Sequence, residues 1–241
     1  MERSQFVSEM QDALAKNKLT PLPEVRLETF YAFASHLLEA NQITNLTAIR
    51  NFSDVITKHF VDSLLVEPFI SQGARFLDLG CGAGFPSLPL AIVRPDLSIV
   101  ALDSTAKKIA FVNEATSLLG LSNLKAISGR AEDAKILAAL GKFDVVTSRA
   151  VAALPILSEL CLPYAKLGGR FLPLKASKAD EEVSAARKGI VFLGGSEPIM
   201  HACTLRTQQG EEPRCIIEVT KQKETPKGYP RAYAAILKKP L

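Results

Sequence analysis

The stretch FLDLGCGAGFP, residues 76–86, decides the fold that the sequence predicts. It begins with a short apolar run typical of a buried strand and continues into three glycines at alternate positions, Gly80, Gly82 and Gly84. In an open parallel sheet, ligands bind beyond the carboxyl ends of the strands, where the first turn needs glycines so that the backbone can approach the ligand closely. A tight turn alone would need fewer glycines, so the stretch predicts a ligand-binding turn after the first strand.

Strands and helices alternate from Gly73 onward. The expected strands are ARFLDL (74–79), SIVALD (98–103), LKAIS (124–128), FDVVTS (143–148) and GRFLPLK (169–175), each followed by a helical pattern. Two later runs, IVFLGG (190–195) and RCIIEVT (214–220), have no helix between them and predict an antiparallel hairpin at one edge of the sheet. The alternation predicts an α/β fold with a doubly wound, mostly parallel, seven-stranded Rossmann-like sheet.

The segment before Gly73 has a different pattern, with capped stretches of helical periodicity. Three helices are expected, from Ser4 to about Lys16, from the prolines Pro21 and Pro23 through Ala40, and from Ser53 to about Phe69. We therefore expect an N-terminal helical extension over residues 1–72, a ligand-binding domain over 73–220 and a basic C-terminal tail over 221–241.

The formal net charge of +4 is unevenly distributed. Residues 221–241 hold six basic residues and one acid, Glu224, and so carry +5, which leaves −1 for the rest of the chain. Such a tail could neutralise RNA phosphates. Its side chains Tyr229, Tyr233, Ile236 and Leu237 could instead cover an apolar surface while the lysines stay solvated, and the sequence leaves both alternatives open.

Composition and cysteine spacing exclude several classes of protein. With 47% apolar and 22% charged residues, the 241-residue chain has a globular composition and not that of a disordered or collagen-like protein. Its four cysteines are widely spaced, without a CxxC pair or a histidine at ligand spacing, which predicts free thiols in the cytoplasm and no metal site. No apolar stretch approaches the roughly 18 residues of a membrane span, so we expect no membrane contact.

The glycine spacing also indicates the class of ligand. A dinucleotide-binding turn reads GxGxxG, whereas this chain has GxGxG with Asp78 two residues ahead of the first glycine. A carboxylate at that place would repel a diphosphate but would suit the ammonium group of an amino acid. S-adenosylmethionine therefore fits the turn better than a nicotinamide dinucleotide, and a nicotinamide-dependent oxidoreductase is the poorer interpretation.

Residues after the second and third predicted strands complete the expected nucleoside site. Asp103 ends the second strand, where an acid can accept hydrogen bonds from both ribose hydroxyls. Asp103 could instead cap the following helix, but Ser104 can perform that role and leave Asp103 to the ribose. Ala131 and Glu132, in the run GRAED after the third strand, could bracket the edge of the adenine ring.

Motifs spread over nearly the whole chain give this sequence a family resemblance. They are NLTAIR (45–50), KHFVDSLL (58–65), LDLGCGAGFPSLPLAIVRPD (77–96), LDSTAKKIAFV (102–112), SGRAED (128–133), FDVVTSRA (143–150), GGRFLPLK (168–175) and the closing YPR and KKPL. With them the chain resembles class I S-adenosylmethionine-dependent methyltransferases and, more narrowly, the bacterial small-subunit ribosomal RNA guanine-N7 methyltransferase family (RsmG, or glucose-inhibited division protein B). It departs from the family pattern at Ser87 and Ala176, where glycine is usual, and in the tail, which lacks the glycine and proline that usually follow YPR.

The resemblance implies an enzyme that methylates N7 of a guanine in 16S ribosomal RNA. Its partner would be that RNA or a small-subunit ribosomal particle, and a monomer is the favoured state. Guanine N7 already carries a free lone pair, so no catalytic acid or base is expected, and the enzyme would act mainly by aligning the reactants. A non-enzymatic RNA-binding factor for ribosome assembly, built on a methyltransferase fold, is the alternative.

Site residues are expected in two groups. Cofactor binding is expected at Asp78, Gly80, Gly82, Gly84, Phe85, Asp103, Ser104, Ala131, Glu132 and Arg149, and RNA contact at His59, Arg130, Arg149 and Lys175. Three of these residues have a structural alternative. Arg149 could pair with a carboxylate such as Asp78, Lys175 could be an exposed lysine at a strand end, and His59 could be a helix histidine with satisfied hydrogen bonds.

Overall fold

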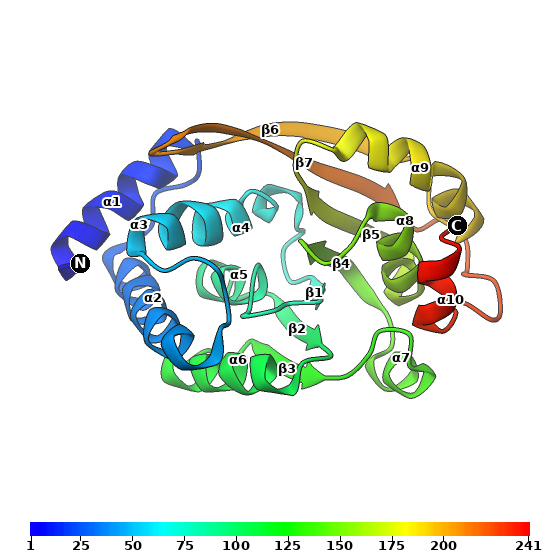
Figure 1. Ribbon diagram of the computed structural model, residues 1–241, viewed down its shortest axis with the longest axis horizontal. Coiled ribbons are helices and arrows are strands. Elements are labelled where there is room, and N and C mark those ends of the chain that lie inside the picture. The colour runs from blue at the N-terminus through cyan, green and yellow to red at the C-terminus, as the bar shows by residue number, and fades with distance from the viewer.

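A seven-stranded sheet forms the centre of the molecule (Figure 1). The computed structural model describes residues 1–241, and its strands are β1 (Arg75–Leu79), β2 (Ser98–Asp103), β3 (Leu124–Ser128), β4 (Phe143–Arg149), β5 (Ala165–Lys175), β6 (Ile199–Thr207) and β7 (Gly210–Thr220). They lie in the order β3-β2-β1-β4-β5-β7-β6, with β1 to β5 parallel and β7 antiparallel to both β5 and β6. The predicted doubly wound, mostly parallel sheet is confirmed.

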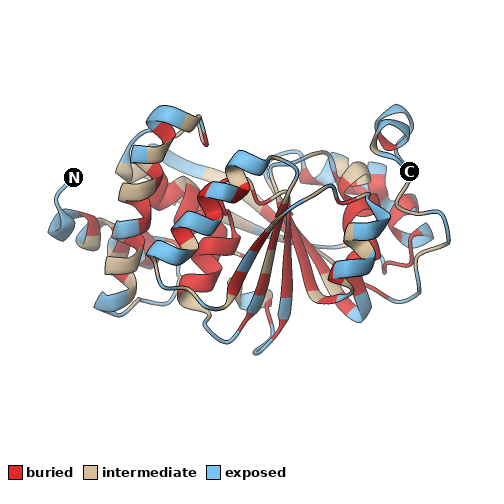
Figure 2. Ribbon diagram, turned by 90° about the horizontal axis from the view of Figure 1, so that it is seen from below, coloured by how far each residue is buried: buried red, intermediate tan, exposed pale blue.

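Helices cover both faces of the sheet, and the buried residues concentrate between the sheet and the helices on each face (Figure 2). The helices are α1 (Arg3–Lys16), α2 (Glu24–Thr44), α3 (Phe52–Asp54), α4 (Asp62–Leu64), α5 (Ser87–Val93), α6 (Ala106–Leu118), α7 (Ala134–Leu140), α8 (Leu154–Cys161), α9 (Ala179–Phe192) and α10 (Tyr233–Lys238). Successive side chains of β1 enter different cores. Phe76 packs with the N-terminal helices, α5 and α6, whereas Leu77 packs with α8 and α9. Burial on both faces explains why the parallel strands are nearly continuous apolar runs.

The expected hairpin at the sheet edge forms, but the prediction of its first strand was wrong. IVFLGG (190–195) belongs to the end of α9 and the turn after it, and β6 begins only at Ile199. Ile190 continues the buried stripe of α9 that contains Val183 and Ala186, so helical spacing prevails over the β propensity of the run. The actual strand, IMHACTLRT, mixes polar and apolar residues because β6 lies at the edge of the sheet.

The third N-terminal helix is interrupted. After α3 the chain forms a seven-residue π-helix, η1 (Val55–Val61), then α4, and then the short 3₁₀-helix η2 (Glu67–Phe69); a second 3₁₀-helix, η3 (Leu162–Tyr164), follows α8. The other two N-terminal helices form as predicted, with α2 extending beyond Ala40. A π-helix is rare and is frequently found at functional sites. Here it carries Lys58 and His59 and ends just before Asp62, three residues that all contact Arg149 in the site described below.

The C-terminal tail docks onto the domain. Ile236 of α10 is fully buried in the core that contains α8 and α9, and α10 lies beside α8 in Figure 1. The fully buried carboxylate of Glu159, on α8, accepts hydrogen bonds from the backbone N–H and from Nε of Arg231, each at 2.8 Å. The tail is therefore held by an ion pair as well as by apolar burial.

The hairpin of β6 and β7 crosses the molecule to α1 (Figure 1). There Asn17 exchanges two hydrogen bonds with the backbone of Arg206, at 3.0 and 2.7 Å. None of the helices combines the length and the apolar character that crossing a bilayer requires. No three or more His, Cys, Asp or Glu side chains gather in a group that could hold a metal ion.

Candidate active site

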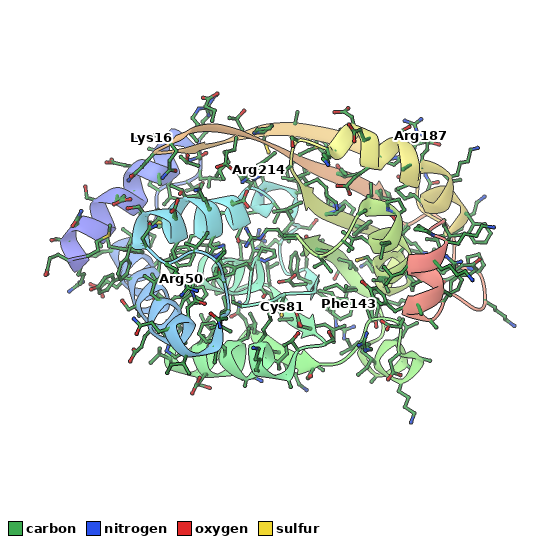
Figure 3. The ribbon with its side chains drawn as sticks, in the orientation of Figure 1. Lys16, Arg50, Cys81, Phe143, Arg187 and Arg214 are labelled. Carbon is green, nitrogen blue, oxygen red and sulfur yellow. The ribbon has the colours of Figure 1, made fainter.

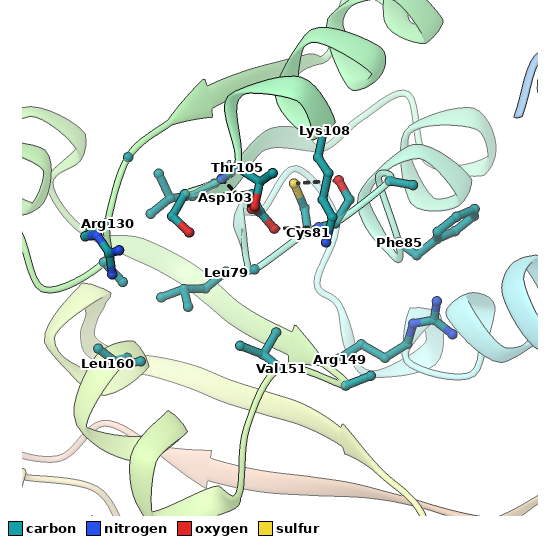
Figure 4. A pocket seen from close by; sticks show the side chains of 18 of the residues that line it. Leu79, Cys81, Phe85, Asp103, Thr105, Lys108, Arg130, Arg149, Val151 and Leu160 are labelled. Carbon is teal, nitrogen blue, oxygen red and sulfur yellow. Dashed lines mark hydrogen bonds between the residues drawn. The ribbon is translucent and has the colours of Figure 1, made fainter. Parts of the chain in front are cut away.

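A cavity of about 460 Å³ opens at the carboxyl ends of β1 to β4. Its walls come from the segments after these strands, from three residues of the N-terminal region and from the tail. In Figure 4, Arg130 lies at one end of the cavity, Arg149 and Phe85 lie at the other, and Asp103 lies between them. Since the strand order reverses between β1 and β4, the cavity occupies the switch point where doubly wound sheets bind their ligands.

Most of the predicted site residues meet in this cavity. Those that line it are His59, Gly80, Gly82, Phe85, Asp103, Ser104, Arg130, Ala131, Glu132 and Arg149, whereas Asp78, Gly84 and Lys175 lie outside its lining. The side chain of Lys175 is only 8% exposed, and its Nζ contacts the carbonyl oxygen of Ala152 at 2.6 Å and a carboxylate oxygen of Glu182 at 2.7 Å. Lys175 is therefore not the exposed strand-end lysine that the sequence allowed.

The three glycines of the loop have different surroundings. All three have positive φ angles, 78° at Gly80, 57° at Gly82 and 90° at Gly84. A Cβ atom at Gly80 would lie 2.4 Å from a methyl group of Val151, and one at Gly84 would lie 2.4 Å from a methyl group of Leu88. A Cβ atom at Gly82 would meet nothing within 4 Å. Gly80 and Gly84 therefore allow close packing, and Gly82 leaves the cavity open for a ligand to approach the backbone.

Asp78 lies beneath the loop and is completely buried. Its Oδ2 accepts a hydrogen bond from the backbone N–H of Ser87 at 3.1 Å, and its Oδ1 has no partner. Burial raises the pKa of this carboxyl to about 7, against the opposing effect of the Ser87 hydrogen bond. Asp78 thus anchors the start of α5, and Ser87, one of the departures from the family pattern, provides the anchor through its backbone.

Asp103 holds the loop and the start of α6 together. Its Oδ2 accepts from the backbone N–H of Gly82 at 3.0 Å, and its Oδ1 accepts from that of Thr105 at 2.8 Å. The expectation that Ser104 caps the helix is wrong, because α6 begins at Ala106 and Asp103 itself provides the side-chain hydrogen bond at this end. Each carboxylate oxygen offers more than one acceptor site, so Asp103 retains capacity for ligand hydroxyls on the cavity side.

Arg149 forms the centre of a polar network at the other end of the cavity. Its guanidinium contacts Oδ2 of Asp62 at 2.8 Å, the carbonyl oxygen of Lys58 at 3.0 Å and Nδ1 of His59 at 3.3 Å. The carboxylate that pairs with Arg149 is therefore Asp62 and not Asp78. Asp62 also accepts from Nε of Arg214 at 2.7 Å, and Arg214 lies between the hairpin and α4 in Figure 3. The network joins β4, the π-helix and β7 at the cavity.

His59 is packed between a cation and an aromatic ring. Its ring stacks on Phe85 with centroids 4.3 Å apart, and its Nε2 lies 2.8 Å from Oγ1 of Thr47. Burial, with the charge of Arg149, lowers the pKa of His59 to about 3. The imidazole is therefore neutral at neutral pH, and its hydrogen bonds are satisfied, as in the structural alternative. It also lines the cavity, and its contact with RNA stays a prediction.

Thr47 and Tyr233 are among the residues of the cavity wall that received no role from the sequence. Thr47 comes from the NLTAIR segment, and Tyr233 comes from α10 in the tail. The only sequence signal for Tyr233 was the presence of apolar side chains in a basic tail, which indicated docking without indicating where. For Thr47 the only signal was its place within a family motif, which assigns no contact.

Comparisons with known proteins agree with this architecture. The model of the family described as rRNA small subunit methyltransferase G matches residues 26–210. The chain is 45% identical over 219 residues to the ribosomal RNA small subunit methyltransferase G of Lachnoclostridium phytofermentans, covering 90% of each chain. It is 42% identical over 239 residues to the protein of that name from Ligilactobacillus salivarius, covering 97% of this chain and 98% of the relative.

Solved structures share the fold at low sequence identity. A putative O-methyltransferase from Klebsiella pneumoniae gives a TM-score of 0.54 at 20% identity, over 90% of this chain and 99% of its own. An O-methyltransferase from Bacillus cereus gives 0.53 at 19% identity, over 91% and 100%. These two structures support the class I methyltransferase fold alone, whereas the sequence matches define the family. The chain belongs to the rRNA small subunit methyltransferase G family.

Proposed function

We propose that this protein transfers a methyl group from S-adenosylmethionine to N7 of a guanine in 16S ribosomal RNA, either as RNA or within a small-subunit ribosomal particle. Membership of the family supports the reaction class and the substrate class. The observation that supports the choice of atom is that the polar groups around Arg149 are engaged with one another: Asp62 pairs with Arg149 and Arg214, and Nδ1 of His59 faces the Arg149 guanidinium. Reaction on ribosomal RNA implies a cytoplasmic location.

The residues of the cavity fit the proposed cofactor. Gly82 leaves open the approach to the loop, and Asp103 offers acceptors to ribose hydroxyls at the end of β2. Ala131 and Glu132 line the cavity after β3, where the adenine ring is expected. When bound, S-adenosylmethionine would supply a methyl group carried on a positively charged sulfur. Its nucleoside would lie toward Arg130 and the methyl group toward Arg149.

Asp62, His59 and Cys81 are the carboxylate, imidazole and thiol near Arg149, and none of the three is free to act as a base or as a nucleophile. Asp62 is held by ion pairs with Arg149 and Arg214. The pKa of His59 is lowered to about 3, and its Nδ1 lone pair faces the Arg149 guanidinium. Burial raises the pKa of the Cys81 thiol well above its usual value, so it supplies no thiolate.

A site of this kind suits a nucleophile that loses no proton. Guanine N7 attacks through a lone pair that is already available, so the protein's own contribution is to hold the base in line and to support its charge. Methylation of cytosine C5, which requires a nucleophilic thiolate, fits the cavity poorly. The chemistry of the engaged groups therefore favours N7.

The test combines cofactor binding with mapping of the product. Calorimetry should detect binding of S-adenosylmethionine, and incubation with small-subunit ribosomal RNA from cells lacking this protein should produce 7-methylguanosine at one position by mass mapping. The variant Cys81→Ala should retain transfer, since no thiolate takes part. Methylation of another atom, or loss of transfer in Cys81→Ala, would contradict the proposal. RNA binding without any transfer would support the alternative, a ribosome-assembly factor.

A further inference from the structure

The tautomer of His59 follows from its neighbours. Nη2 of Arg149 lies 3.3 Å from Nδ1 of the imidazole, with an N–H directed at it. A guanidinium has donors and no acceptor, so Nδ1 must carry the lone pair that accepts this hydrogen bond. Because the ring is neutral, its single proton resides on Nε2. Arg149 therefore fixes His59 as a donor on the side that faces Thr47.

This tautomer determines the role of the Thr47 hydroxyl. Oγ1 of Thr47 lies 2.8 Å from Nε2 of His59 and accepts that N–H, and it also accepts the backbone N–H of Ile49 at 3.2 Å. Two incoming hydrogen bonds occupy both lone pairs of the oxygen. The O–H of Thr47 has no acceptor among the protein atoms, and Thr47 lines the cavity. The hydroxyl can only donate to a ligand and cannot accept from one.

The loop that carries Thr47 is held in place by the side chain of Asn41. Asn41 of α2 is almost fully buried, and its side chain amide donates to the carbonyl oxygens of Thr47 at 2.9 Å and of Ile49 at 3.1 Å. Its Oδ1 accepts from the backbone N–H of Thr47 at 2.9 Å. Hydrogen bonds on both sides of the peptide fix the position of Thr47 before any ligand arrives, which lowers the ordering cost of recognition.

Thr47 lies at the end of the cavity where the target base is expected. It contacts His59, whose ring stacks on Phe85 and bonds to Arg149, and both Phe85 and Arg149 mark the end opposite Arg130 (Figure 4). The nucleoside of the cofactor is expected toward Arg130, so the methyl acceptor must enter from the Arg149 end. A donor fixed at this end would face the base that is methylated.

We propose that the Thr47 hydroxyl donates a hydrogen bond to O6 of the target guanine and so selects guanine over adenine, an inference that rests on the proposed function. Guanine presents two neighbouring acceptors on this edge, N7 and O6, whereas adenine presents the acceptor N7 beside the N6 amino donor. Both bases have an N7 that could attack a methyl group, so selection must come from the neighbouring atom. A hydroxyl restricted to donation pairs with O6 and leaves the N6 amino group of adenine without a partner, an unpaired donor that costs binding free energy.

A double-mutant cycle that combines one protein substitution with one RNA substitution tests the contact between Thr47 and O6. Thr47→Val keeps the shape of the side chain and removes the hydroxyl. In the RNA, the guanine that the wild-type protein methylates is replaced by 2-aminopurine, which keeps N7 and the 2-amino group but lacks O6. Each single change should lower kcat/KM about 10- to 100-fold, and the two together should lower it no further than either alone. Thr47→Ser, which keeps the donor, should stay within a few-fold of the wild type.

Two results would overturn the assignment. One is a loss of kcat/KM in the double change that equals the product of the two single losses, because independent effects mean that Thr47 and O6 do not touch. The other is a Thr47→Val variant that loses S-adenosylmethionine affinity by calorimetry as much as it loses rate, because Thr47 would then support the cavity as a whole. The RNA change needs no protein variant, so misfolding cannot hide its outcome. A wild-type protein that forms no 7-methylguanosine refutes the proposed function, whereas normal wild-type transfer with multiplied losses refutes only the contact with O6.

Discussion

Replacing Asp78 with asparagine tests how a buried carboxyl at the glycine loop affects stability. Burial raises the pKa of Asp78 from 3.8 to about 7 in the folded protein. Between these two values the folded protein keeps a proton that the unfolded chain has released, so the free energy of unfolding decreases as the pH rises. At about 1.4 kcal/mol for each pH unit, the loss reaches about 4 kcal/mol near pH 7 and stays constant above it.

His59 produces a change of the opposite sign over much of the same range. Its pKa falls from 6.5 to about 3 on folding, so below pH 6.5 the unfolded chain binds a proton that the folded protein does not. Stability then increases as the pH rises from about 3 to 6.5. The two effects largely cancel in the wild-type protein, and a nearly flat pH profile would conceal both. Subtracting the wild-type profile from that of Asp78→Asn removes the His59 contribution and isolates Asp78.

The assay is urea unfolding of both proteins, without cofactor, across about pH 4 to pH 8. The stability of Asp78→Asn minus that of the wild type should increase by about 4 kcal/mol from the acid end to pH 7 and then level off. Any fixed cost of the new amide is the same at every pH and leaves this slope unchanged. His59→Gln serves as the control, because its difference profile should have the opposite slope. A flat difference for Asp78→Asn would show that the carboxyl is not desolvated and would refute the reasoning.

Two further changes separate ligand binding from folding. Gly82→Ala should weaken S-adenosylmethionine binding, measured by calorimetry, and should lower the free energy of unfolding by about 1 kcal/mol because its backbone is left-handed. Gly84→Ala should lower the free energy of unfolding by about 2–4 kcal/mol, because its methyl group also collides with Leu88. Equal effects of the two variants on binding and on melting would contradict this division. Arg231→Ala removes the guanidinium that pairs with the buried Glu159 carboxylate and leaves it only the backbone N–H of residue 231, so it should cost about 3 kcal/mol in thermal unfolding. Adding Glu159→Gln should restore most of this loss. An unchanged melting temperature in Arg231→Ala would show that the ion pair with Glu159 contributes no stability.

The fold was predictable because its signals are local. Apolar periodicity and the glycine turn of residues 76–86 depend on residues that are close in the sequence, and they identified the parallel strands and the position of the cavity. The failure at IVFLGG has a local cause too, since a short apolar run is compatible with both a buried helix end and a strand. Helix and strand are distinguished only by tertiary packing, in which Ile190 is buried on the same side of α9 as Val183.

The contacts that give the site its chemistry were not predictable in the same way. Arg149 and its partner Asp62 are 87 residues apart, and Arg214 is 152 residues from Asp62. Pairing of Arg149 with a carboxylate such as Asp78 was only an alternative in the sequence analysis, and nothing local distinguishes Asp62 from Asp78 as that carboxylate. The donor role of Thr47 depends on the same long-range contact, because it is Arg149 that fixes the tautomer of His59.

The tail illustrates how tertiary contacts change the meaning of a charge count. Six basic residues left open both an RNA-binding segment and a docked segment with solvated lysines, and in the structure Lys221 is almost fully buried and Arg231 pairs with Glu159. The four lysines that remain at the surface are Lys223, Lys227, Lys238 and Lys239. Tyr233 of the same segment lines the cavity, and Ile236 fixes α10 against the core. The tail is therefore a docked segment that forms part of the cavity wall, and its four exposed lysines are the charges that remain available for the predicted RNA contact.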